Sequence, residues 1–300
     1  ESRRLLYMNR HRGRLLISAA LGLIAITAGV CGFGWFFFMQ ADLARAVACL
    51  IPACVIPLTL NVWTTGPINA YLRDHKKIFM PRLAAALGGF SFFPARGIRS
   101  AVLEKTGVVP PHGRYDCEDC FMGVYKGMHV LFSEARLYQS GSRRAPVFHG
   151  LMALIELPQD GIEGHTIITA DRDMAREWAE TRWRTLASVP VNVGKEEWNR
   201  FAVFSDQPES ARLLIGDKFL KELHEAGEAF DHAPLTAVLF RGKNIFLMIP
   251  THQDMFEASP IRTAVSTRKY ALAMRREIAG LLEIIDIFDL YKPAPSVKNT

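Results

Sequence analysis

The chain lacks the motifs that identify several large enzyme classes. Its 300 residues contain no Gly-rich phosphate loop and no dinucleotide-binding glycine fingerprint, the motifs by which many enzymes hold nucleotides. No Gly-x-Ser-x-Gly elbow is present, so the nucleophile of the α/β-hydrolases is missing. The nine histidines are dispersed and form no HxxxH or HxH pair. The sequence therefore predicts no catalytic constellation, no cofactor and no metal site.

Charge is missing from two long stretches near the N-terminus. Leu15 to Met39 are 25 consecutive residues without a charge, and Ala46 to Leu72 form a second uncharged run. A membrane-spanning helix needs about 20 apolar residues. The first run is too long for the apolar core of a secretory signal, and the second run follows at once. We therefore expect two transmembrane helices, at about 15–39 and 46–66, that fix the protein in the lipid bilayer as a hairpin.

Basic residues flank the two uncharged runs, whereas the connector between the runs offers only Asp42 and Arg45. An excess of Lys and Arg marks cytoplasmic flanks and suits anionic lipid headgroups. We expect both termini to lie in the cytoplasm. No basic and aromatic residues interleave elsewhere, so nucleic acid is not an expected partner. The flanking residues are Arg3, Arg4, Arg10, Arg12 and Arg14 before the first run, and Arg73, Lys76, Lys77 and Arg82 after the second.

Small residues in the first run allow another helix to approach closely, and Gly29 and Gly32 are the main candidates for this contact. The favoured interpretation is that the two helices of the hairpin pack on each other. The alternative is that these glycines contact a partner subunit. Neither run contains an ionisable residue, so we expect no proton path or ion site within the spans.

Cysteine is scarce outside the apolar runs, where only Cys117 and Cys120 occur, as a CxxC motif. A structural zinc site normally needs a second pair of ligands, and the sequence offers none. Glu118 and Asp119 lie inside the motif and are expected to be exposed carboxylates on opposite faces of a strand. They would not lower a thiol pKa. We expect two reduced, inert cysteines.

The remaining residues predict an α+β domain with mainly antiparallel strands. Turns at Lys126–Gly127 and Arg241–Asn244 each separate two apolar runs and predict hairpins. From Ser259 to about Leu290, apolar residues recur at helical spacing and predict a long C-terminal helix. The expected organisation is 1–72 for the basic segment and spans, 73–106 for a membrane-proximal helical linker, 107–290 for the cytoplasmic domain and 291–300 for an extended tail. The expected core is one contiguous cluster of Ile155, Ile167, Phe204, Leu214, Leu239 and Phe246.

Short motifs in a fixed order resemble a known family. They are Glu118-Asp119, Phe121, Gly123, Gly127 and Phe132-Ser133-Glu134-Ala135, then Val147 to Leu151 and Val203 to Arg212. Together they resemble the bacterial family called domain of unknown function 3137. The resemblance implies two N-terminal spans in a bacterial inner membrane and a cytoplasmic domain. It implies no reaction, substrate or cofactor. Some relatives are encoded beside LemA-type membrane proteins, which implies assembly with such a partner. Cys117 and Cys120 depart from the family pattern, where smaller or apolar residues are common.

A few polar residues remain as candidates for a ligand or ion-pair role. Glu134 follows Ser133, but no base activates that serine. Arg212 follows Glu209, so a helical ion pair is the default, with anion binding as the alternative. Asp206 and Glu209 should form a capping box at this helix.

Two histidines, His149 and His165, are expected in neighbouring strands, where they could face one another, although a metal site there would still lack ligands.

Apolar residues on two sides of the C-terminal helix predict a contact with another subunit, because a helix that is apolar on more than one side usually has more than one neighbour. The interaction residues are Ile284, Ile287 and Phe288, to which Gly29 and Gly32 add a contact within the membrane. The expected function is a non-enzymatic, membrane-anchored assembly, scaffold or regulatory subunit, in a homo-oligomer or with other membrane subunits. The alternative is a membrane-bound enzyme or a sensor of a phosphorylated or lipid-derived ligand. A polar pocket joining Arg212, Glu134 and a histidine would favour that alternative.

Overall fold

The computed structural model of the protein describes residues 2–86, 88–141, 145–157, 163–190, 200–230, 233–251, 254–257, 261, 272 and 282. The chain divides into two compact units. Unit 1 comprises Glu1–Phe79 and Ala258–Tyr270, and unit 2 comprises Met80–Glu257 and Ala271–Thr300. The described part of unit 1 is helical, whereas unit 2 is built on a β-sheet.

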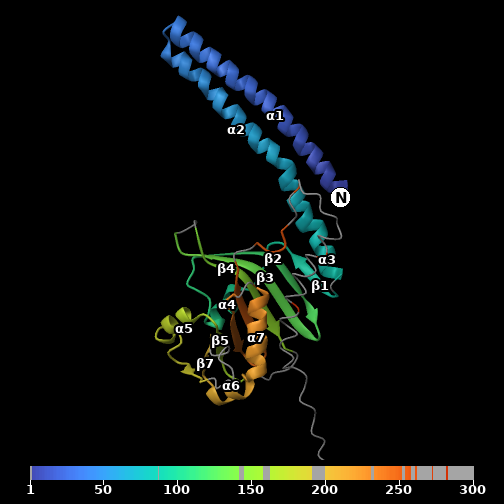
Figure 1. Cartoon of the computed structure of the whole chain (residues 1–300), viewed down its shortest axis with the longest axis vertical. Helices are drawn as coiled ribbons and strands as arrows, with labels where there is room; N and C mark the ends of the chain where they lie inside the picture. The colour runs from blue at the N-terminus through green and yellow to red at the C-terminus, as the bar shows by residue number, and fades with distance from the viewer. Residues whose placement is uncertain are drawn as a thin grey trace, which may run out of the picture. The chain divides into compact units, whose positions relative to one another are not determined.

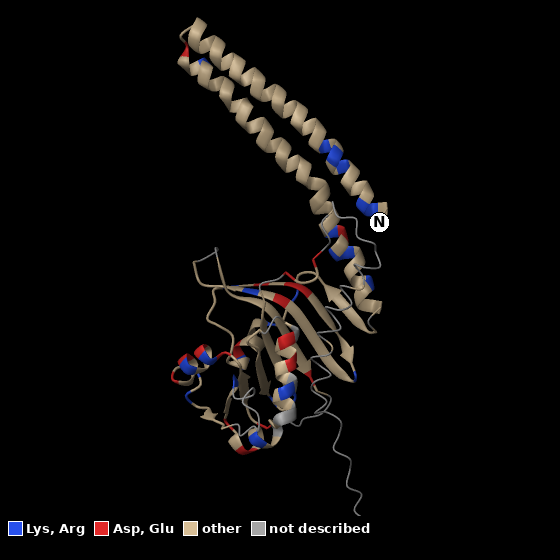
Figure 2. Cartoon of the chain, viewed as in Figure 1, with Lys and Arg blue, Asp and Glu red and all other residues tan. Residues whose placement is uncertain are grey.

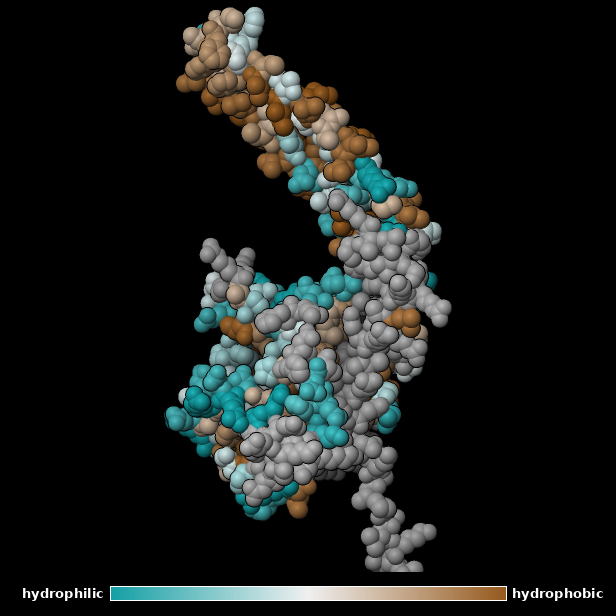
Figure 3. Space-filling view, viewed as in Figure 1, coloured by the Kyte–Doolittle hydropathy of each residue, from teal (hydrophilic) through white to brown (hydrophobic). Residues whose placement is uncertain are grey.

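Unit 1 contains the expected pair of apolar helices, which lie side by side as a hairpin (Figure 1). Both are long and apolar enough to cross a membrane. Most of their large apolar side chains are exposed, and these appear as brown surface on both helices in Figure 3. Figure 2 shows that charged residues are absent over long stretches of both. The elements are α1 (Ser2–Gly34), the π-helical turn η1 (Trp35–Met39), α2 (Leu43–Asp74) and the π-helical turn η2 (His75–Phe79).

The two glycines singled out in α1 face α2. A Cβ atom on Gly29 would lie 2.9 Å from the carbonyl oxygen of Cys49 and 2.5 Å from the Cβ of Ala53. A Cβ on Gly32 would lie 3.0 Å from the Sγ of Cys49. Only glycine permits backbones to approach this closely, so the favoured interpretation, packing within the hairpin, agrees with the structure. A partner contact at these glycines stays a prediction.

Polar contacts fix the basic end of α1 along α2. The Tyr7 hydroxyl donates to Oδ2 of Asp74 at 2.6 Å, and His11 Nδ1 lies 2.9 Å from the carbonyl oxygen of Thr64. Arg14 donates to the carbonyl oxygen of Trp63 at 3.0 Å, and its guanidinium lies 4.7 Å from the centre of that ring. These bonds satisfy polar groups at the end of the hairpin and leave its apolar remainder to pack through small residues.

Unit 2 is an antiparallel sheet with helices, and the predicted α+β class is confirmed. Among the described residues, nine strands pair in the order β1-β2-β3-β4-β9-β8-β5-β7-β6, and every pair is antiparallel. The strands are β1 (Phe90–Phe93), β2 (Arg114–Tyr125), β3 (Met128–Tyr138), β4 (Pro146–Glu156), β5 (Thr166–Thr169), β6 (Ala187–Ser188), β7 (Ala202–Ser205), β8 (Thr236–Phe240) and β9 (Asn244–Pro250). The helices are α3 (Met80–Ala86), α4 (Ser100–Thr106), α5 (Arg172–Ala179), α6 (Pro208–Leu214) and α7 (Asp217–Ala229).

Both predicted hairpins form, and their turns explain why. Lys126 and Gly127 have φ angles of 50° and 83°, and Arg241 and Gly242 have φ angles of 56° and 77°. Two successive residues with positive φ give the turn whose twist matches that of the flanking strands. Gly123 precedes the first turn and has a different role. A Cβ there would lie 2.7 Å from the carbonyl oxygen of Gly89, so it lets β1 approach β2.

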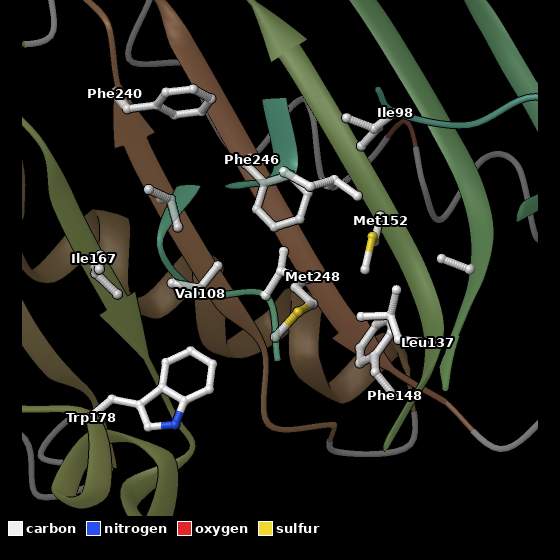
Figure 4. Packing of buried hydrophobic residues seen from close by; sticks show 14 of the residues in the cluster. Ile98, Val108, Leu137, Phe148, Met152, Ile167, Trp178, Phe240, Phe246 and Met248 are labelled. Atoms are coloured by element: carbon white, nitrogen blue, oxygen red, sulfur yellow. The ribbon is translucent and has the colours of Figure 1, made fainter. Parts of the chain in front are cut away.

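Apolar side chains cover both faces of the sheet, so the prediction of one contiguous core cluster is wrong. Ile167, Phe204 and Phe246 lie in a cluster that includes residues of α4 and α5 (Figure 4). Ile155 and Leu239 are also buried, and both are register partners of Ile245. Ile245 directly precedes Phe246 on β9, so these three side chains point to the sheet face opposite that of Phe246. Figure 1 shows α7 in front of the strands. The side chain of Leu214 lies outside the described residues.

One further prediction differs from the structure, and another lies outside the described residues. A strand, β1, occurs within 73–106, the range expected to be a helical linker, and it pairs with β2 from Phe90 to Phe93. Its four residues are too few to show a clear alternation of apolar and polar side chains. Apart from residues 261, 272 and 282, the long C-terminal helix expected from Ser259 to Leu290 lies outside the described part of the chain.

Candidate functional site

Strand geometry brings a buried carboxylate, an arginine and a histidine together on one face of the sheet. Glu134 and Arg136 are two residues apart on β3 and therefore point to the same face. His149 on β4 is the cross-strand partner of Arg136. The Glu134 side chain is only 3% exposed, whereas those of His149 and Arg136 are 16% and 25% exposed.

Glu134 accepts three hydrogen bonds. Its Oε1 lies 2.7 Å from Nη2 of Arg136 and 3.0 Å from Nε2 of His149. Its Oε2 accepts the backbone N–H of Met255 at 3.1 Å. A buried carboxylate is costly unless it is paired and hydrogen-bonded, and this one is both.

The segment that follows β9 completes the arrangement. Asp254 Oδ1 lies 2.6 Å from Nη2 of Arg136 and 3.4 Å from Nε2 of His149. Arg136 also contacts Oε1 of Glu118 on β2 at 3.4 Å. Burial and the neighbouring carboxylates act in opposite directions on Arg136, and the net result is that its pKa is raised. We call Glu134, Arg136, His149 and Asp254 the Glu134 cluster.

An aromatic contact holds the same segment beside the cluster. Phe256 is 1% exposed, and its ring centre lies 5.0 Å from that of Phe121 and 6.5 Å from that of Phe132. The segment 254–257 is therefore fastened to β2, β3 and β4 by charge at one end and by aromatic packing at the other. The Glu134 cluster thus holds this segment against the sheet, and we call this ion-paired arrangement the clasp.

A metal ion is the other chemical possibility at this place. Glu134, His149 and Asp254 each offer one ligand atom, and these atoms lie within 4.8 Å of one another. However, Nη2 of Arg136 already lies within 2.7 Å of one oxygen from each carboxylate. A guanidinium held between the two carboxylates provides the positive charge that an ion would bring, and it would repel a cation. The donor set therefore fits an ion-pair clasp better than a metal site.

Arg212 does not join this cluster. It lies on α6, where its Nη1 is 3.0 Å from Oε1 of Glu209, and both side chains are exposed. This contact is the helical ion pair expected from the sequence, and anion binding by Arg212 stays an alternative. The expected capping box is wrong, because the N-cap of α6 is Gln207 and Asp206 instead accepts the backbone N–H of His165 at 2.6 Å. The candidate interaction residues Ile284, Ile287 and Phe288 lie outside the described residues.

His149 and His165 do not face each other. β4 pairs with β3 and β9, whereas His165 directly precedes β5, which pairs with β7 and β8. His165 Nε2 instead lies 3.1 Å from the carbonyl oxygen of Thr106. Burial lowers the pKa of His165, although Thr106 and Asp206 act in the opposite direction.

The CxxC motif lies at a β-bulge in β2. The register shifts between Glu118 and Phe121, and Asp119 has a φ of 51° and is buried, so the expectation of an exposed carboxylate there is wrong. Burial raises the pKa of Cys117, and burial together with Cys117 raises the pKa of Cys120 to about 12. Both thiols are free. The raised pKa values disfavour the thiolate forms, which are the nucleophiles and the metal ligands. The inert role expected for these cysteines stays a prediction.

A groove lies on the sheet face opposite the Glu134 cluster, near the β2–β3 turn. It has a volume of about 950 Å³ and is bounded by strands β1 to β4 and by the segment that leads into α4. Its walls combine apolar side chains with Arg96, Arg99 and His129. Sequence reasoning missed this site, since its residues come from five separate parts of the chain.

Residues 146–290, which begin at β4, match the model of the family described as protein of unknown function (DUF3137). No curated protein matches the sequence. The crystal structure of the mycobacterial trehalose monomycolate transport factor A, TtfA, is similar with a TM-score of 0.40 and 10% identity, covering 74% of this chain and 99% of that chain. The predicted resemblance is confirmed to this extent: the part of the chain from β4 onward, residues 146–290, matches the DUF3137 family model.

Proposed function

We propose that this protein is a non-enzymatic, membrane-anchored assembly or regulatory subunit of a bacterial inner-membrane complex. The observation that carries the proposal is the exposed apolar surface of α1 and α2. Leu16 on α1 is 73% exposed, and Leu58 on α2 is 67% exposed. Two long helices with such surfaces are stable in lipid, whereas in water they would be a large exposed apolar patch.

The length of the apolar stretch supports a spanning arrangement. The 25 uncharged residues from Leu15 to Met39 extend for about 37 Å as a helix, against a hydrocarbon core of about 30 Å. Basic residues lie before this stretch and after the second one. We therefore place both termini and unit 2 in the cytoplasm.

The contacts of the Glu134 cluster support a non-enzymatic role. Each oxygen of Glu134 already accepts a hydrogen bond, and both described contacts of His149 Nε2 are to carboxylate oxygens. The adjacent hydroxyl of Ser133 belongs to the opposite face of β3. A general base needs a proton to take from a nucleophile or substrate, and here the candidate base is occupied by structural contacts.

Partner binding is proposed from the sequence of the C-terminal region. Ile284 and Ile287 extend the apolar stripe that contains Phe288 to a second side of the predicted helix. The partner is a second copy of this chain or another membrane subunit.

Membrane extraction tests the anchor. Alkaline carbonate strips peripheral proteins but leaves spanning helices in the bilayer, so the full chain should stay in the membrane pellet. Release into the supernatant, together with a marker for peripheral proteins, would contradict the anchor.

Sedimentation in a mild detergent tests the assembly. The double substitution Ile284→Glu and Ile287→Glu should lower the mass of the complex or remove co-purifying subunits, because it places charge on the predicted contact. Leu213→Glu is the control, since Leu213 is 90% exposed on α6. An unchanged mass and unchanged co-purifying proteins in the double variant would argue against assembly through this helix.

The second candidate function, a sensor of a small ligand, is favoured by one observation, the groove between β1–β4 and the segment before α4. Its chemistry differs from the pocket expected from the sequence, because neither Glu134 nor Arg212 lines it.

A further inference from the structure

The groove has an apolar floor formed by one row of cross-strand neighbours. Met122, Leu131 and Leu154 are register partners on β2, β3 and β4, so their side chains stand side by side on one face. All three are half-buried and line the groove. Leu131 and Leu154 also pack against the main core cluster, which fixes their positions. The floor is therefore a preformed apolar strip rather than a gap between mobile side chains.

The opposite wall carries two arginines that the backbone holds at the groove. Ile98 is 2% exposed and anchors the segment before α4 in the core. A Cβ on Gly97 would lie 2.6 Å from the Cβ of Cys117, so the segment runs close against β2. Arg96 and Arg99 on either side of this anchor line the groove, and both are exposed.

The charges at the groove are unbalanced. In the described ranges, neither Arg96 nor Arg99 forms an ion pair, and Arg96 lies over the ring of Phe93 at 4.5 Å. Among the described residues that line the groove, Glu156 is the one carboxylate, and it is bonded to Lys243 at 2.5 Å. That bond lowers the pKa of Glu156 and compensates its charge. With His129 nearby, the groove presents net positive charge beside an apolar strip.

We propose that this groove binds an amphiphile with a single alkyl or acyl chain and a phosphate headgroup. The chain lies along Met122, Leu131 and Leu154, and the phosphate binds Arg96 and Arg99, because guanidinium groups match phosphate oxygens in geometry and charge. The volume of about 950 Å³ falls within the range of sites for small ligands. This inference goes beyond the proposed function, since a subunit can assemble with or without such a ligand.

Photolabelling tests the proposal on the full chain in phosphatidylcholine nanodiscs. The probe is dodecyl phosphate with a diazirine near the end of its alkyl chain, and a dodecyl maltoside with the same diazirine is the neutral comparison. The phosphate probe should label peptides that contain Met122, Leu131 or Leu154. The neutral probe should label them far less, because it lacks the charge that Arg96 and Arg99 bind.

Two variants separate headgroup binding from chain binding. The double substitution Arg96→Gln and Arg99→Gln should lower labelling by the phosphate probe at least about tenfold, as expected for the loss of hydrogen bonds to a charged group. Leu131→Trp should block labelling by filling the floor. Arg176→Gln with Arg212→Gln removes the same charge from exposed sites outside the groove and should leave labelling unchanged. Melting curves establish that each variant is folded.

Three outcomes would overturn the proposal. The first is equal labelling by the neutral probe, which would make the groove an unspecific detergent site. The second is unchanged labelling in the folded Arg96 and Arg99 variant. The third is displacement of the probe by a large excess of inorganic phosphate, which would show a site for the free ion. Loss of membrane anchoring or of co-purifying subunits is measured separately and does not affect these results.

Discussion

At the scale of single residues, the Glu134 cluster combines contacts that the sequence predicts with others that it cannot. Residues two apart on a strand share a face, so proximity of Glu134 and Arg136 follows from the strand assignment. Asp254 lies 118 residues from Arg136 along the chain, and Met255 lies 121 residues from Glu134. No local pattern encodes contacts at such separations. The sequence points to Glu134 through its neighbour Ser133, whereas its partners in the structure come from β3, β4 and the segment after β9.

The first residue-scale prediction concerns the clasp. Glu134→Gln should lower the free energy of unfolding by about 1–3 kcal/mol, because an amide cannot accept from Arg136, His149 and the Met255 N–H as the carboxylate does. Urea unfolding followed by tryptophan fluorescence measures the change. Glu209→Gln is the matched control: it breaks the exposed pair with Arg212 and should cost no more than about 0.5 kcal/mol. Equal effects of the two substitutions would refute the clasp.

A second prediction concerns acid sensitivity. The pKa of His165 is lowered in the folded protein, mainly by burial. Below its ordinary pKa of about 6.5 the unfolded chain binds a proton that the folded chain does not, so stability falls as pH falls. Above that pKa the contribution vanishes. His165→Gln should therefore reduce the loss of stability on acidification, by at most about 1.4 kcal/mol per pH unit. Urea midpoints measured from neutral pH to pH ~5 test this prediction. The same change of midpoint with pH in the variant and the parent would contradict it.

The third prediction concerns the CxxC motif. Because the pKa values of Cys117 and Cys120 are raised, both thiols should react slowly with iodoacetamide at neutral pH and rapidly after unfolding. The double substitution Cys117→Ala and Cys120→Ala should leave the metal content of the purified protein unchanged. Alanine is preferred to serine because Cys120 is fully buried. Stoichiometric zinc that disappears in the double variant would show that the motif is a metal site.

At the scale of elements, the hairpins were predictable because each is a local unit. The β2–β3 and β8–β9 hairpins have apolar strands on both sides of a turn, and the chain needs no distant partner to specify them. β1 has only four residues and owes its pairing to the close approach at Gly123. The sequence does not predict the division of the core between two faces, because a strand that is buried on both sides lacks the alternation of apolar and polar residues.

The element-scale prediction concerns the core beneath α5. Phe204 on β7 is 9% exposed, and its ring centre lies 5.1 Å from that of Trp183. Phe204→Ala should lower the free energy of unfolding by about 3–5 kcal/mol, as for other buried aromatic truncations. Leu213→Ala is the control and should change it by no more than about 0.5 kcal/mol, since Leu213 is exposed. If both variants unfold at the same urea concentration, the core assignment is wrong.

At the scale of the whole molecule, the sequence predicts the two apolar helices far better than it predicts the groove. Two uncharged runs are read directly from the residues, and α1 and α2 contain them. The groove, by contrast, depends on how β1 to β4 align and on where the segment before α4 crosses them. A surface of that kind exists only after the sheet has formed. The proposed function therefore depends above all on a membrane hairpin with unit 2 in the cytoplasm.

Cysteine accessibility in a cysteine-free background measures this claim most directly. Gln40→Cys places a thiol in the exposed turn between the helices, and Asp173→Cys places one on α5, where the side chain is 95% exposed. In spheroplasts, a membrane-impermeant maleimide should label Gln40→Cys at once and Asp173→Cys only after the membrane is permeabilised. Labelling of Asp173→Cys in intact spheroplasts, with Gln40→Cys protected, would contradict the account.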